Sequence, residues 1–133
     1  YGHPAHIFVH DAARLAVHTL ADDAPLFYTV QGAFANHPFP LLANKDTPAH
    51  MVMDISPFLE QKTAAAMCHV TQHALFIRHG SEQAGRKLGV AEVIQSVESL
   101  HRVQPQVNGK ERIQDALADL VWASGLATIS PGE

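Results

Sequence analysis

Apolar residues recur with a helical period over residues 6–21. Winding this segment at about 3.6 residues per turn gathers them on one broad face, which predicts an amphipathic helix. That face carries Phe8, Val9, Ala12, Ala13, Leu15, Ala16, Val17 and Leu20. The opposite face carries His10, Asp11, Arg14 and His18. A solvated surface is the expected role of this polar face, because its charges are mixed. His6 falls at the edge of the apolar face, so His6 and His10 are expected to point in different directions.

The next segments alternate between strand and helix signals. Residues 26–30 (LFYTV) and 51–55 (MVMDI) are rich in β-forming residues and predict two short strands. Between them, residues 31–48 have no period and predict a long packed loop near a site. The pair Ser56-Pro57 predicts a helix start, and the helix is expected to run to about residue 77.

Polar residues fall on the apolar face of that second helix. Lys62, His69 and His73 must find hydrogen-bond partners there or line a pocket. Gln72 joins Lys62 and His69 as a possible pocket residue, and ordinary paired groups at a helix–sheet interface are the alternative. Cys68 is interpreted as a small core residue rather than a nucleophile.

The C-terminal part has weaker signals. Residues 78–89 predict an exposed basic connection, and residues 90–98 a short helix or turn. Residues 99–103 fit either a third strand or an extended stretch. Asn108-Gly109 predicts a turn, followed by an amphipathic helix over residues 110–122, in which Trp122 is expected to pack, and a frayed tail over 125–133. Strands that alternate with helices predict an α/β fold.

Composition narrows the class of protein. The chain has 133 residues, which is one domain at most, and 47% of them are hydrophobic. A net charge of −4 argues against a nucleic-acid partner. No apolar run approaches the roughly 20 residues of a membrane span. The single Cys68 excludes an internal disulfide and favours a reducing, cytoplasmic location.

The candidate chemistry lies at the start of the chain. The sequence Tyr1-Gly2-His3-Pro4-Ala5-His6 places two histidines three residues apart at the mouth of the first helix. Both can point into one pocket, and neutral imidazole is a common metal ligand near neutral pH. The other eight of the ten histidines are scattered along the chain, and His37 is interpreted as a loop residue.

The opening motif and a later stretch together resemble the zinc-dependent de-N-acetylases of the PIG-L/LmbE family. The family pattern Y-G-H-P-D-H followed by a helix is similar to residues 1–6, and its D-[IV]-S strand end, helical lysine and H-x-[ST]-Q are similar to residues 54–72. The likeness covers most of residues 1–103. It implies a Rossmann-like three-layer α/β fold and a mononuclear zinc site that hydrolyses an acetamide, usually on an amino sugar.

In this family, two zinc ligands and the general base belong to an early H-P-D-D-E motif, which this chain does not contain. The resemblance therefore implies that residues 1–133 are a single partial domain, the C-terminal portion of a deacetylase that is incomplete as this chain. His6 matches the third zinc ligand. His3 matches the histidine that stabilises the oxyanion or protonates the leaving amine, and Tyr1 matches a tyrosine that reaches the substrate carbonyl.

One position departs from the family pattern. Ala5 stands where the family has an Asp that holds and tunes the first histidine. This puts the acid role of His3 in question more than the metal-ligand role of His6.

Two alternatives stay open on the sequence. Ala5 also fits a degenerate, non-catalytic relative that acts as a binding or scaffold module. An unrelated, small histidine-rich metal-binding protein is the other, although most of the histidines fall on different faces. The sequence does not name the substrate, and uncovered apolar surface leaves room for a homo-oligomer.

Overall fold

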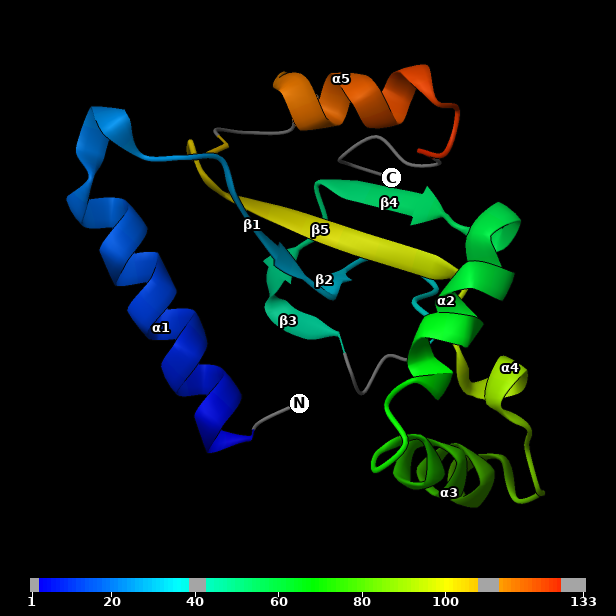
Figure 1. Ribbon diagram of the computed structural model, residues 1–133. Helices are drawn as coiled ribbons and strands as arrows, with labels where there is room; N and C mark the ends of the chain where they lie inside the picture. The colour runs from blue at the N-terminus through cyan, green and yellow to red at the C-terminus, as the bar shows by residue number, and fades with distance from the viewer. Residues whose placement is uncertain (1–2, 39–42, 108–112, 128–133) are drawn as a thin grey trace. The chain divides into compact units, whose positions relative to one another are not determined.

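The computed structural model describes residues 3–38, 43–107 and 113–127 and has a mixed α/β architecture with a small sheet (Figure 1). The chain forms two compact units, one of residues 1–53 and 98–133 and the other of residues 54–97. The predicted α/β class is confirmed, whereas the single partial domain stays a prediction.

The first unit begins with helix α1, Pro4–Thr19, followed by a 3₁₀ turn at Ala21–Asp23. The predicted helix is confirmed, and its apolar face is largely exposed. Phe8 is 73% exposed and Leu15 is 64% exposed, and none of the residues of α1 is buried. The helical pattern reports a face that is able to pack, and the described residues do not cover that face.

A three-stranded sheet with the order β1-β5-β4 is the centre of this unit. Strand β1 is Phe27–Val30, β4 is Met51–Asp54 and β5 is Val97–Gln104. β1 pairs with β5 in antiparallel register, with Tyr28 opposite Arg102. The two predicted strands are confirmed, and the open choice for residues 99–103 is settled as a strand.

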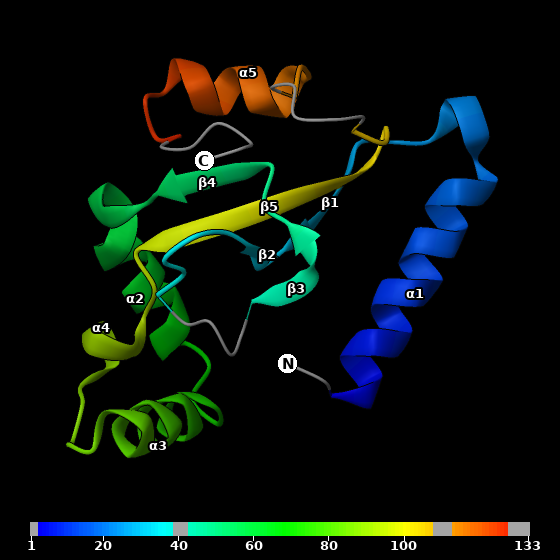
Figure 2. The same ribbon diagram turned by 180° about the vertical axis from the view of Figure 1, so that it is seen from behind.

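The predicted loop over residues 31–48 is only partly a loop. It contains β2, Gly32–Ala33, and β3, Asn44–Pro48, which form a small parallel pair (Figure 2). Periodicity missed these strands because one is two residues long and the other is exposed and polar. Their contact needs a glycine, since a Cβ on Gly32 would lie only 2.8 Å from the Cα of Ala49.

The core of the first unit lies where helix α5, Ala116–Ala123, meets the sheet. Its buried members are Met51, Ile113, Ala118 and Val121. Trp122 packs against this cluster, as predicted. The predicted helix start at residue 110 is wrong for the described part, because residues 113–115 are not helical and Asp115 caps the helix. The predicted turn at Asn108-Gly109 lies outside the described residues, as do residues 128–133 of the tail; Ala127 pairs with Met53 through an isolated bridge.

The second unit is helical. Ser56–Phe58 forms a 3₁₀ turn and leads into α2, Leu59–Met67, then α3, His73–Ala84, and the short α4, Val90–Val93. The prediction of one continuous helix over residues 56–77 is therefore wrong, because residues 68–72 separate α2 from α3. The exposed connection predicted from residue 78 is helical up to Ala84, where Gly85 adopts a positive φ of 65° and ends α3.

Candidate functional site

The His3–His6 motif forms the N-terminal turn of α1. His3 is the N-cap residue, with extended backbone angles, and its Nδ1 accepts a hydrogen bond from the Ala5 amide at 3.3 Å. Pro4 follows at the first helical position, where its missing N–H costs nothing. The His3 carbonyl accepts from the amide of His6 at 3.0 Å. Contacts within the first turn of α1 therefore help to position both histidines.

The two imidazole rings lie close together on an exposed helix end. Their centroids are 5.5 Å apart and the rings meet edge to face at 80°. Because Nδ1 of His3 accepts an amide proton, the neutral ring carries its own proton on Nε2. His3 therefore presents an N–H donor, which suits the donor role that the family resemblance gives it.

The remaining parts of the predicted site are not brought together here. Tyr1 lies outside the described residues. The side chain of Ala5 is a methyl group, so it offers no hydrogen-bond acceptor to His3. Within the described ranges, no group of three or more histidine, cysteine or acidic side chains is placed to hold a metal ion. Imidazole is a normal zinc ligand, so His6 fits the donor chemistry as one member of a larger ligand set.

The other residues singled out from the sequence are either paired with a neighbour or exposed to solvent. Lys62 donates to the carbonyl of Gln95 at 2.7 Å, which favours the paired alternative for this side chain. His69 and Gln72 are exposed, and His37 packs against Phe34. Cys68 is exposed rather than part of a core, because it caps the C-terminus of α2, a helix with no buried residue. Its thiol donates to the Ala64 carbonyl at 3.5 Å.

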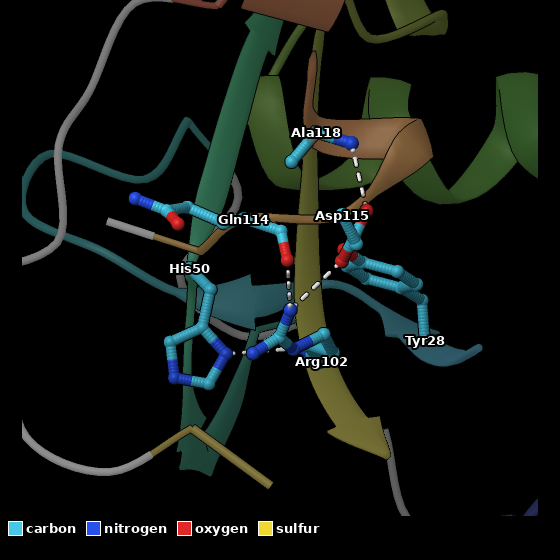
Figure 3. A network of polar contacts seen from close by, with 6 residues as sticks. All are labelled: Tyr28, His50, Arg102, Gln114, Asp115 and Ala118. Atoms are coloured by element: carbon cyan, nitrogen blue, oxygen red, sulfur yellow. Dashed lines mark hydrogen bonds and ion pairs between the residues drawn. The ribbon is translucent and has the colours of Figure 1, made fainter. Parts of the chain in front are cut away.

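A polar network that the sequence did not reveal joins β1, β5 and α5 (Figure 3). The Asp115 carboxylate accepts from the Tyr28 hydroxyl, from Arg102 Nη1 at 2.9 Å and from the Ala118 amide at 2.9 Å. The side chains of Arg102 and Asp115 are only 10% and 7% exposed. A nearly buried ion pair of this kind depends on every partner being present.

The pKa values in this network follow from its contacts. Burial acts to raise the pKa of Asp115, but the hydrogen bonds from Tyr28, Ala118 and Arg102 outweigh it and leave that pKa below its ordinary value. Burial raises the pKa of the Tyr28 hydroxyl, and its hydrogen bond to the Asp115 carboxylate raises it further. Asp115 is therefore ionised and Tyr28 is neutral at neutral pH.

Two stacked histidines lie beside this network. The rings of His50 and His101 have centroids 4.4 Å apart and are inclined by only 25°. His50 Nδ1 accepts from the backbone amide of Arg102 at 3.0 Å, and His101 Nδ1 lies 2.7 Å from the Pro48 carbonyl. Burial lowers the pKa of His50 to about 4, helped by the nearby charges of His101 and Arg102. His50 is therefore neutral at physiological pH.

The sequence held one signal for this region. Strand β5 carries His101 and Arg102 between the apolar residues Leu100 and Val103, and His50 directly precedes β4. Polar groups inside a strand of a small sheet need partners. Those partners, Tyr28 and Asp115, lie 74 and 13 residues from Arg102 by their numbers in the chain.

Comparisons of this chain with protein-family models, with curated proteins and with solved structures found no match.

We expect Asp115→Ala to destabilise the protein strongly. The change removes the cap of α5 and leaves Arg102 buried without its counter-ion, which together cost roughly 3–5 kcal/mol. Asp115→Asn retains a capping oxygen and is expected to cost less. The measurement is the free energy of unfolding from a urea titration. Asp119→Ala, which removes an exposed carboxylate from the same helix, is the matched control, and equal losses in the two alanine variants would contradict the role of Asp115.

The lowered pKa of His50 predicts an acid-sensitive stability. The unfolded chain takes up a proton near the ordinary value of 6.5, while the folded chain resists protonation at His50 down to about 4. Stability contributed by neutral His50 is therefore complete above about pH 6.5 and is lost as the pH falls toward 4. His50→Asn keeps an acceptor for the Arg102 amide but does not titrate, so its melting temperature is expected to fall less over this range. His18→Asn is the control, and equal slopes in parent and His50→Asn would refute the prediction.

Proposed function

We propose that this chain is the C-terminal portion of a zinc-dependent N-deacetylase that resembles the PIG-L/LmbE family and hydrolyses an acetamide on an amino sugar or a related small molecule. The observation that carries the proposal is the arrangement of His3 and His6. An N-cap histidine with an Nε2–H donor stands 5.5 Å, ring to ring, from a second histidine on an exposed helix end. The same residues carry the family's second motif, and residues 54–72 carry its later one.

In this proposal, each residue of the motif has a separate task. His6 offers an imidazole nitrogen as the third metal ligand, and the other two ligands and the general base come from the family's early motif. Bound zinc supplies a Lewis acid and a water whose pKa falls to about 7. His3 donates through Nε2 to the oxyanion that forms on the acetamide carbonyl, or gives its proton to the leaving amine. Tyr1 reaches the same carbonyl from the preceding segment.

The proposal extends to the setting of the enzyme. The complete protein would have a Rossmann-like three-layer fold, of which the sheet β1-β5-β4 and its helices would be one part. We place the activity in the cytoplasm, because the single Cys68 is an exposed thiol. None of the helices in the described ranges is long and apolar enough to cross a bilayer. Exposed apolar residues on α1, such as Phe8 and Leu15, form a surface that could bind a second copy of the chain in a homo-oligomer.

The metal-ligand role of His6 can be tested directly. The protein is produced from its gene with the coding sequence that precedes Tyr1, and its zinc content is measured by atomic emission after dialysis. We expect about one zinc per chain in the parent and a loss of stoichiometric zinc in His6→Ala, because a catalytic site has three protein ligands. His18→Ala removes an exposed histidine from the same helix and is expected to keep the metal. Full zinc in His6→Ala would refute the assignment.

A second candidate function is that of a degenerate relative, and the observation that favours it is Ala5. An acid at this position would tune His3, and alanine does not. The two functions are separated by activity against a panel of acetamides in the same longer protein.

For an active deacetylase, we expect His3→Gln to lower kcat by roughly 10²–10³-fold, as expected for the loss of an oxyanion donor. Ala5→Asp is expected to raise kcat in the parent but not in the His3→Gln background, because the acid acts through His3. The measurement is kcat and KM for each variant, with zinc content as the control for folding. Equal inactivity of parent and Ala5→Asp, with zinc bound, would favour the scaffold.

A further inference from the structure

The first unit contains a cavity of about 390 Å³ that involves neither His3 nor His6. Its polar lining residues are His10, Arg14, Thr47, His50, His101 and Arg102, together with Gln106. The described residues that line it include no carboxylate. Its volume is within the range of roughly 300–1,000 Å³ that is usual for small-molecule sites. Besides Pro48, Val103 and Val107, the lining is polar and includes the cation Arg14, which suits an anionic ligand.

The backbone fixes which ring nitrogen of each histidine can meet a ligand. His50 uses Nδ1 to accept from the Arg102 amide, so the neutral ring carries its proton on Nε2. Figure 3 shows Nδ1 of His50 turned toward Arg102, with the second ring nitrogen on the far side of the ring. His101 must donate from Nδ1, because its partner is the Pro48 carbonyl, and the neutral ring then has a lone pair on Nε2. The stacked pair therefore offers one N–H donor and one acceptor.

This donor and acceptor pair discriminates between classes of ligand. A metal ion needs an unprotonated nitrogen, and Nε2 of His50 is protonated, so the two rings together do not suit a metal. A fully ionised anion such as sulfate satisfies His50 and Arg14 but has no proton for His101. A hydrogen phosphate group satisfies both rings, since its P–O oxygens accept and its P–OH donates. Arginine guanidinium groups such as that of Arg14 match phosphate oxygens in geometry and charge.

We propose that the cavity bounded by His50, His101 and Arg14 is a binding site for a protonated phosphate group, either inorganic phosphate or a small phosphate-bearing molecule. This site is independent of the proposed deacetylase function, because none of the residues of the His3–His6 motif takes part in it. Arg102 supports the site by holding His50 in its tautomer through the main chain, while its side chain remains paired with Asp115.

The test is calorimetric titration of the full 133-residue chain with inorganic phosphate at pH 8 and low ionic strength, in parallel with sulfate and with methyl phosphate at pH 6, where a P–OH is retained. We expect phosphate to bind at least tenfold more tightly than sulfate at pH 8. Methyl phosphate at pH 6 is expected to bind if the natural ligand is a monoester, and inorganic phosphate alone if it is the free ion. Equal affinity for phosphate and sulfate would overturn the proposal, and so would binding of neither.

Variants distinguish specific phosphate binding in this cavity from non-specific attraction of anions to the protein. His50→Asn keeps the acceptor for the Arg102 amide and removes the Nε2 donor, and it is expected to weaken phosphate binding about tenfold or more. Arg14→Gln changes an exposed side chain on α1, and a similar loss is expected. His18→Asn, on the same helix but outside this cavity, is the matched control and should bind as the parent does. Unchanged affinity in both His50→Asn and Arg14→Gln would refute the assignment.

Discussion

The Asp115 carboxylate is the contact on which the first unit depends. Its two oxygens accept hydrogen bonds from the Ala118 amide in the first turn of α5, from the Tyr28 hydroxyl on β1 and from the Arg102 guanidinium on β5. Helix α5 is only eight residues long, and an isolated helix of this length is unstable in water. It therefore needs both the cap and its burial against Met51 and Ile113. The hydrogen bonds of the nearly buried Asp115 carboxylate fix the orientation of α5 relative to β1 and β5. Apolar packing alone is not directional and does not fix it.

Local chemistry made part of the fold predictable. The strand-forming runs before Gln31 and before Ile55, and the apolar period of α1, each specify an element without help from distant residues. The errors occur where tertiary contacts decide. The break between α2 and α3 has neither proline nor glycine to mark it, and β2 is stabilised by the buried Ser99, whose hydroxyl donates to the Gly32 carbonyl at 2.9 Å.

The candidate sites divide in the same way. The turn of His3 and His6 follows from an N-cap, a proline and two histidines in six residues, so the sequence could place it. The network of Tyr28, Arg102 and Asp115 could not be placed, because its members come from three elements that only the folded sheet brings together. A family resemblance supplied only proposed roles for the first group. It contributed nothing for the second, whose properties come from geometry alone.

Arg102 has different partners for its main chain and its side chain. Its main-chain amide donates to His50, and its side chain pairs with the residue that caps α5. A single residue on β5 thus belongs to both the histidine cavity and the helix cap. Any coupling between these two contacts is reciprocal, so a ligand that orders His50 through Arg102 would favour the capped state of α5 to the same extent. Strand β5 is the element that carries both contacts, one through its main chain and one through a side chain.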